Sequence, residues 1–324
     1  MPSAFDAWCK AHGRVYATAE EERTRRATYE TNRGVVEKHN SAFKDGRVTW
    51  AMTLDGPFAD LTDAEFVDRH LMAPQNCSAT KNASAGTTER GELPRAVDWR
   101  TKGVITPVKN QGHCGSCWTF STTGTLEAHH CIKHKRDCSG WTGLSEQNLV
   151  DCAGAYDNHG CAGGLPSHAF EYVRHNGGID TEDAYAYVGK DEKCSFNPAD
   201  VGATVADVFN ITAYDEQGIA DALAKVGPVA IAYQVSGDFR LYSHGIYDSR
   251  NATTGEVMCK SGPMDVNHAV MAVGYGEADV PGGSTGYFIV KNSWGSLWGM
   301  EGYFWIKRGE NLCGLADCAS YPIV

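Results

Sequence analysis

The chain has 324 residues, which is long enough for two domains and a large hydrophobic core. Its formal net charge is −11 and it has no run of basic residues, so a nucleic-acid-binding surface is not expected. Nowhere do apolar residues continue far enough to cross a bilayer, so we expect no membrane-spanning segment.

Cysteines and glycosylation sequences indicate a protein made in the secretory pathway. The chain has 12 cysteines, and disulfides form in oxidising compartments. Four Asn-X-Ser/Thr sequences are candidate sites for N-glycosylation: Asn76, Asn82, Asn210 and Asn251. The first residues lack an apolar core of the signal-peptide kind, so we expect that a signal peptide has been removed.

The first periodic segment predicts a long helix. Six residues are spaced by 4, 4, 3, 4 and 4 positions: Glu21, Arg25, Tyr29, Asn32, Val36 and Asn40. At about 100° per residue they share one stripe of a helix. The same residues also fit an ordinary amphipathic helix supported by Glu-to-Arg pairs one turn apart.

The segment from Ala73 to Glu92 reads as a linker. It is rich in Ala, Ser, Thr and Asn and poor in aliphatic residues, a composition typical of a segment that is cut and lost. Cys77 lies within it, and a cysteine in a disposable linker has a purpose only if it pairs. The C-terminal run from Cys313 to Cys318 offers a partner.

The richest motif runs from Gln111 to Ser121 and reads Gln-Gly-His-Cys-Gly-Ser-Cys-Trp-Thr-Phe-Ser. A Cys-X-X-Cys pair alone is as often a redox pair or half of a zinc site. As a nucleophile, Cys117 needs a lowered thiol pKa, which a helix N-terminus and a nearby imidazolium provide. We expect that helix over residues 116–132, although its threonines are poor helix formers. Gln111 is placed to donate its side-chain amide, beside the backbone N–H of Cys117, to an oxyanion.

Two later motifs supply the partners of a nucleophilic cysteine. His268 and Asn292 follow in this order, each beside an apolar β-rich run. A histidine can take the thiol proton and return it to a leaving amine, and an amide can hold its ring without taking the proton. Trp294 is expected to shield the His268–Asn292 hydrogen bond, although a core position is the alternative. We assign the long spacing before Asn292 to loops such as Glu277 to Gly286.

Together these motifs resemble the papain family of cysteine peptidases along the whole chain. The resemblance implies an α+β, papain-like two-lobe fold, with a helical left lobe, a β-barrel-like right lobe and the cleft between them. It also implies a helical N-terminal propeptide domain, because the stripe resembles the family's Glu-Arg-Phe-Asn-Ile-Asn motif with Tyr29 for Phe and Val36 for Ile. The expected boundaries are 1–92 for the inhibitory propeptide and 93–324 for the peptidase domain. Within the propeptide we expect a helical inhibitor part (1–70), a mini-chain (73–80) and an activation linker (81–92).

Local patterns predict further elements of the two lobes. Ser145 is a candidate N-cap for a helix that ends at Cys152, and a second helix is expected over Pro166 to Asn176. Four β-rich runs are expected to be strands: Val229 to Val235, His268 to Gly274, Tyr287 to Lys291 and Gly302 to Lys307.

The resemblance also implies most of the disulfides. The family pattern pairs Cys114 with Cys161, Cys152 with Cys194, and Cys259 with Cys313. The mini-chain, which resembles that of cathepsin H, adds Cys77 with Cys318. Cys131 and Cys138 lie in a short inserted segment and are paired with each other as a local loop. Cys117 then stays free to react, and Cys9 is left without an assigned role.

The resemblance to cathepsin H implies a lysosomal-type peptidase precursor that acts mainly as an aminopeptidase, with some endopeptidase activity. Its expected substrate-binding residues are Gly163, Gly164, Trp294 and Thr80, the last as the free carboxyl end of the mini-chain. One alternative is a cathepsin L-like endopeptidase that loses the mini-chain, and another is a non-catalytic glycosylated binding scaffold. We expect no metal and no cofactor. The expected partners are peptide or protein substrates, the chain's own propeptide and cystatin-like inhibitors. We expect a monomer in a lysosome or another acidic vesicle, or secreted.

Overall fold

The computed structural model describes residues 3–77 and 92–324 of the chain. Within these residues, no helix combines the length and the apolar character needed to cross a membrane. The α-helices are α1 (Ala4–Ala11), α2 (Ala19–Lys44), α3 (Asp63–His70), α4 (Cys117–His134), α5 (Glu146–Cys152), α6 (Pro166–Asn176) and α7 (Glu216–Lys225). Short 3-10 helices are η2 (Trp99–Lys102), η3 (Ala153–Tyr156), η4 (Gly160–Ala162), η5 (Pro198–Asp200), η6 (Gly237–Leu241) and η7 (Leu312–Gly314).

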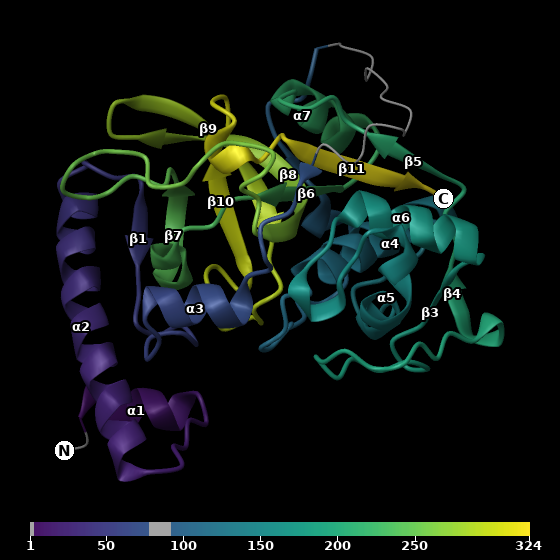
Figure 1. Ribbon diagram of the computed structural model, residues 1–324. Helices are drawn as coiled ribbons and strands as arrows, with labels where there is room; N and C mark the ends of the chain where they lie inside the picture. The colour runs from purple at the N-terminus through teal and green to yellow at the C-terminus, as the bar shows by residue number, and fades with distance from the viewer. Residues whose placement is uncertain (1–2, 78–91) are drawn as a thin grey trace.

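A twisted sheet of nine strands forms one half of the molecule, and its order is β1-β7-β10-β9-β8-β6-β11-β5, with β2 paired to β8. Its strands are β1 (Trp50–Met52), β2 (Val97–Asp98), β5 (Asp207–Asn210), β6 (Val229–Tyr233), β7 (Tyr242–Tyr247), β8 (His268–Val280), β9 (Gly283–Lys291), β10 (Tyr303–Lys307) and β11 (Cys318–Ile323). The pair β7–β10 is parallel and the other pairs are antiparallel. Figure 1 shows helices α4, α5 and α6 gathered on the other side, in teal, with β3 (Ile179–Asp180) and β4 (Val201–Ala203). The expected α+β architecture, with one helical and one β lobe, is confirmed.

The predicted stripe of residues lies on α2. Thr18 caps this helix by accepting the Glu21 N–H, and Tyr29, Asn32 and Val36 are buried. Tyr29 joins Phe5 and Trp8 of α1 in a small aromatic cluster, with the rings of Phe5 and Tyr29 5.5 Å apart. A helix that is exposed on one side gains most of its stability from such a packed face.

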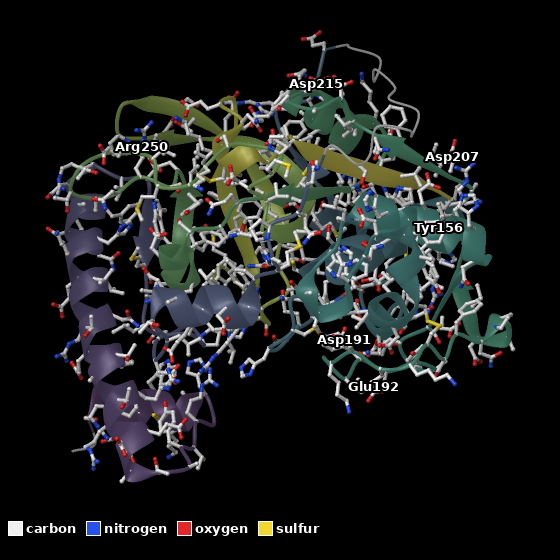
Figure 2. All side chains as sticks on the ribbon, in the orientation of Figure 1. Tyr156, Asp191, Glu192, Asp207, Asp215 and Arg250 are labelled. Carbon is white, nitrogen blue, oxygen red and sulfur yellow. A yellow bond between two sulfur atoms is a disulfide. The ribbon has the colours of Figure 1, made fainter. Side chains whose placement is uncertain are left out.

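The N-terminal unit, residues 3–77, shares its core with the β lobe. Its strand β1 pairs with β7, which places Trp50 opposite Gly245. Phe58 and Phe66 are buried in the same apolar cluster as Phe239. In Figure 1 the chain rises along one side of the sheet as α2, returns as β1 between α2 and β7, and leads through α3 toward the helical lobe. The loop that carries Arg250 lies beside the upper end of α2 (Figure 2), where Arg47 donates to the carbonyl of Ala252.

Several predicted boundaries need correction. The helix expected over 116–132 begins at Cys117 and ends at His134, and the strand expected to end at Val235 ends at Tyr233. The expected loop from Glu277 to Gly286 is wrong, because β8 and β9 continue through it as a hairpin that pairs Glu277 with Gly286. Apolar and polar residues hardly alternate in this glycine-rich, half-exposed hairpin, so the sequence gives little sign of strands here. The two strands form because their backbones pair with each other. The helices expected at 145–152 and 166–176 are present, the first with Ser145 as its N-cap.

The described residues, which include all 12 cysteines, form five disulfides in the pairs that the sequence analysis expected: Cys77–Cys318, Cys114–Cys161, Cys131–Cys138, Cys152–Cys194 and Cys259–Cys313. Cys9 and Cys117 are the free cysteines.

The candidate glycosylation sites differ in accessibility. Asn210 is only 8% exposed and pairs with Ser320 within the sheet, so its side chain is largely covered in the folded chain. Asn251 lies in a half-exposed turn, where its side-chain oxygen accepts the N–H groups of Thr253 and Thr254. Asn76 lies in the segment that crosses the molecule toward Cys318, and Asn82 lies outside the described residues.

Candidate active site

Cys117 lies at the N-terminus of α4, a helix whose sequence is unfavourable by propensity. Its side chain is fully buried, and most of the helix is buried around it. The threonine hydroxyls are satisfied locally: Thr119 donates to the carbonyl of Ser116, and Thr122 to that of Trp118. Tertiary burial therefore overrides the poor propensity of this segment. The helix N-terminus then directs its unpaired N–H groups and its positive dipole end toward the sulfur.

His268 reaches the same point from the β lobe. It begins β8, and the N–H of the next residue, Ala269, donates to the sulfur of Cys117 at 3.3 Å. His268 Nε2 lies 2.8 Å from the side-chain oxygen of Asn292. Because an amide oxygen only accepts, Nε2 carries the proton and Nδ1 is the basic nitrogen. Trp294 is 1% exposed and stacks on the imidazole with ring centroids 4.6 Å apart, as expected for a residue that shields this hydrogen bond.

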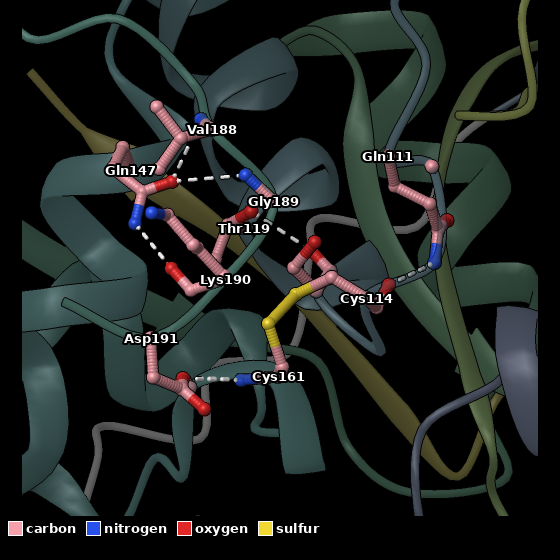
Figure 3. Close-up of a disulfide and its surroundings, with 12 residues drawn as sticks. Gln111, Cys114, Thr119, Gln147, Cys161, Val188, Gly189, Lys190 and Asp191 are labelled. Atoms are coloured by element: carbon pink, nitrogen blue, oxygen red, sulfur yellow. Dashed lines mark hydrogen bonds between the residues drawn. A yellow bond between two sulfur atoms is a disulfide. The ribbon is translucent and has the colours of Figure 1, made fainter.

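Gln111 is fixed from both lobes. Its side-chain nitrogen donates to the carbonyl of Cys114 at 2.9 Å, a bond drawn in Figure 3 beside the Cys114–Cys161 disulfide. Its side-chain oxygen accepts the hydroxyl of Ser293 at 2.7 Å. The N–H of Ser293 also donates to the side-chain oxygen of Asn292, so Ser293 connects the side chains of Gln111 and Asn292. The sequence analysis missed Ser293, although its place between Asn292 and Trp294 in the same motif was a usable signal.

The end of the N-terminal unit runs through this site. The carbonyl of His70 accepts the side-chain nitrogen of Gln111 at 3.0 Å, so the amide expected to bind an oxyanion is occupied. Met72 donates its N–H to the carbonyl of Asn267 at 3.0 Å, and Gln75 donates to that of Val266 at 2.9 Å in an antiparallel bridge. Two residues later the disulfide from Cys77 reaches Cys318.

Comparison with known proteins identifies this arrangement. Residues 93–323 match the family described as Papain family cysteine protease, and residues 5–66 match the Cathepsin propeptide inhibitor domain (I29). The chain belongs to the papain family of cysteine proteases. The expected family is therefore confirmed, and the N-terminal unit (residues 3–77), which contains the matched propeptide inhibitor domain, is called the propeptide below.

Individual relatives agree with this family. The chain is 48% identical to the pro-cathepsin H of Mus musculus over 322 residues, which covers 98% of this chain and 90% of the mouse protein. It is 48% identical to the thiol protease aleurain of Arabidopsis thaliana over 322 residues, covering 99% of this chain and 84% of the plant protein. The structure of the digestive procathepsin L2 proteinase from the Tenebrio molitor larval midgut matches with a TM-score of 0.87 and 35% identity, covering 99% of this chain and 98% of that one. The papain-like fold is thereby confirmed as well.

Burial in the precursor shifts the pKa values of Cys117 and His268. Burial raises the pKa of the Cys117 thiol to about 12, although N–H donors such as that of Ala269 act in the opposite direction. Burial lowers the pKa of His268 to about 4, against the hydrogen bond that His268 donates to Asn292, and the nearby His70 lowers it further. The precursor therefore holds a neutral thiol and a neutral imidazole. The thiolate expected at Cys117 therefore stays a prediction for the enzyme without its propeptide.

The two glycines expected to bind substrate have different environments. A Cβ atom on Gly163 would lie 2.6 Å from the side-chain nitrogen of Gln75 and 3.0 Å from the Cβ of Met72, so this glycine faces the last residues of the propeptide. A Cβ atom on Gly164 would instead lie 2.8 Å from the ring of Trp118, so packing inside the helical lobe requires this glycine. The backbone bond to the propeptide is made one residue earlier, where Ala73 donates to the carbonyl of Ala162. Thr80 lies outside the described residues.

Proposed function

We propose that this chain is the precursor of a cysteine peptidase that acts mainly as an aminopeptidase, with residues 1–92 as inhibitory propeptide and 93–324 as peptidase domain. In this proposal the mini-chain, residues 73–80, stays attached after the remainder of the propeptide has been removed. The observation that carries the proposal is the disulfide from Cys77 to Cys318, beside the strand-like contact of Gln75 with Val266 in the cleft. The similarity to pro-cathepsin H supports it.

The chemical step assigns a role to each residue of the site. His268 Nδ1 takes the proton of the Cys117 thiol, and the thiolate attacks the carbonyl carbon of the scissile bond. Gln111 and the backbone N–H of Cys117 stabilise the oxyanion as the tetrahedral adduct forms. The imidazolium then protonates the leaving amine, which leaves a thioester on Cys117. Water hydrolyses that thioester with His268 as the base, and Asn292 keeps the ring in position throughout.

Selectivity for free amino termini follows from the end of the mini-chain. Cleavage after Thr80 would create a carboxylate three residues beyond Cys77, within about 11 Å of the Cα atom of that residue. A carboxylate held by a disulfide at the wall of the cleft would pair with the α-ammonium group of a substrate. Such an ion pair in a partly desolvated site contributes a few kcal/mol at most, which is enough to favour free over blocked substrates.

The test compares hydrolysis of a free amino-acid amide with that of its N-blocked form. We expect the mature wild-type enzyme to prefer the free amide, and the Cys77→Ala variant to lose this preference and gain endopeptidase activity. The matched control is Cys131→Ser with Cys138→Ser, which removes another disulfide and should keep the preference. A mature enzyme that prefers the blocked amide would favour a cathepsin L-like endopeptidase. Failure of a thiol-directed epoxide to label Cys117 after maturation would favour a non-catalytic scaffold.

The surroundings of the enzyme form part of the same proposal. An acidic vesicle fits the net charge of −11 and the family, and residues near Asn251 are accessible for a glycan. Cystatin-like inhibitors would enter the cleft that the propeptide leaves, and the chain is proposed to act as a monomer.

A further inference from the structure

Tyr187 contacts both ends of the segment from Gln111 to Ser116, which directly precedes Cys117. Its hydroxyl donates to the backbone carbonyl of Gln111 at 2.7 Å and lies 2.6 Å from the hydroxyl of Ser116. Because the tyrosine proton is used on the carbonyl, the serine hydroxyl donates to the tyrosine oxygen. Ser116 is the N-cap of α4 and makes no side-chain capping bond to the helix, so its hydroxyl serves this contact instead.

We propose that Tyr187 is a positioning residue that holds Gln111 and the first turn of α4 at a fixed separation, so that the two oxyanion donors converge on one point. The proposal rests on the proposed function, since it takes Gln111 and the N–H of Cys117 as those donors. Ser293 fixes the side chain of Gln111 from the β lobe. Tyr187 fixes its backbone from the helical lobe.

The tyrosine itself lies on a well-anchored segment. Its own N–H donates to the carboxylate of Glu182 at 2.9 Å, and its ring packs edge-on against that of Phe120 with centroids 5.0 Å apart. The next two residues, Val188 and Gly189, both donate to the side-chain oxygen of Gln147, as Figure 3 shows. A hydroxyl placed by such a rigid segment can hold a backbone carbonyl more closely than water could.

This anchoring continues to the disulfide beside the site. Asp191, labelled on the loop below α5 in Figure 2, accepts the N–H of Cys161 at 2.8 Å. Cys161 is bonded to Cys114, whose carbonyl accepts the side chain of Gln111. The segment 187–191 therefore contacts the turn 111–116 at two points, directly through Tyr187 and indirectly through Asp191 and the Cys114–Cys161 disulfide.

A matched pair of tyrosines allows a clean test. Tyr187→Phe removes the hydroxyl and keeps the ring, and Tyr185→Phe does the same two residues away, where the hydroxyl donates to Asp151 instead of Gln111. On an amino-acid amide, we expect Tyr187→Phe to lower kcat of the mature enzyme about tenfold with KM changed less than about twofold, because a small misplacement of a donor mainly affects the transition state. Tyr185→Phe should leave both constants within about twofold.

The decisive measurement is a double-mutant cycle with Gln111→Ala, which alone should lower kcat about a hundredfold or more. If Tyr187 acts through Gln111, adding Tyr187→Phe to Gln111→Ala should lower kcat by less than about twofold. Full additivity, or an equal loss in Tyr185→Phe, would overturn the positioning role. If Gln111→Ala itself leaves kcat unchanged, the proposed site fails and not only the role of Tyr187. Ser116→Ala, which removes the other partner of the hydroxyl, provides a second variant and should also lower kcat and leave KM unchanged.

Discussion

His70 makes the docking of the propeptide sensitive to acid. It ends α3, is 4% exposed, and its Nδ1 lies 2.9 Å from the carbonyl of Gly112 in the peptidase domain. Since a carbonyl only accepts, Nδ1 carries the proton, and Nε2 is a buried nitrogen with no hydrogen-bond partner among the described residues. Protonating Nε2 would therefore create a charge without an acceptor.

The groups around His70 also disfavour that charge. The ring contacts Phe58 at 4.6 Å and His113 of the peptidase domain at 5.0 Å between centroids. Burial lowers the pKa of His70 to about 4, and His113, Arg14 and Arg69 lower it further. His268 is a further basic group close enough to interact with His70.

The sign and size of the effect follow from these values. The ordinary pKa of the ring is 6.5 and that of the docked ring is about 4. The docked state binds the proton more weakly, so docking is strongest above pH 6.5 and weakens as the pH falls from 6.5 toward 4. The full difference is about 3 kcal/mol, and about 2 kcal/mol of it is lost between pH 7 and pH 5.

The substitution His70→Asn tests this reasoning, because an asparagine amide nitrogen can replace Nδ1 as donor to Gly112 but does not titrate. The assay is hydrogen exchange at the N–H groups of Met72 and Gln75, measured on the full chain with Cys117→Ser to prevent self-cleavage. From pH 7 to pH 5 we expect protection in the chain with native His70 to fall about twentyfold more than in the His70→Asn variant. His12→Asn, a substitution elsewhere in the propeptide, is the control and should behave like the chain with native His70. Equal pH dependence with and without the His70→Asn substitution would refute the argument.

Three further variants test the docking of the propeptide and the stability of the peptidase domain. Asn32→Ala should weaken propeptide docking by about 3 kcal/mol, because Asn32 donates to the carbonyls of Ala59 and Leu61 and accepts from the buried Arg240. The precursor should then be activated faster at pH 7, and an unchanged activation rate would contradict this prediction. Phe66→Ala should weaken propeptide docking by about 3 to 4 kcal/mol, because the buried ring packs edge-on against Trp294 with ring centroids 5.1 Å apart. The same assay measures this, and an activation rate equal to that of the wild-type precursor would contradict it. Cys131→Ser with Cys138→Ser should lower the free energy of unfolding by about 2.5 kcal/mol, because the disulfide closes a loop between cysteines 7 residues apart. Urea unfolding measures this difference. A loss of activity without a loss of stability would contradict this purely structural role.

The sequence predicted elements well where periodicity and chemistry agree. The six-residue stripe predicted α2, and several of its members have partners in the propeptide: Arg25 binds Glu65, Asn32 binds the carbonyls before α3, and Asn40 donates to Met52. The helix of Cys117 was expected from its motif and not from its threonines, which tertiary burial stabilises.

Other features depend on contacts that no local pattern reveals. The short strand β1 exists because β7 offers a free edge, and β5, β7 and β11 are strands because of pairing across the sheet. The hydroxyl of Tyr187 reaches the backbone carbonyl of Gln111 from a distant part of the chain. Burial in the folded chain likewise shifts the pKa values of Cys117 and His268, which residue types alone do not indicate.

Retention of the mini-chain is the central claim, and the mass of the matured enzyme tests it most directly. The chain is matured in acid and its intact mass is compared before and after a reducing agent is added. We predict that reduction releases one peptide that contains Cys77 and ends at Thr80, while the peptidase domain keeps a free thiol at Cys318. A matured enzyme whose mass contains no such peptide before reduction would contradict the account.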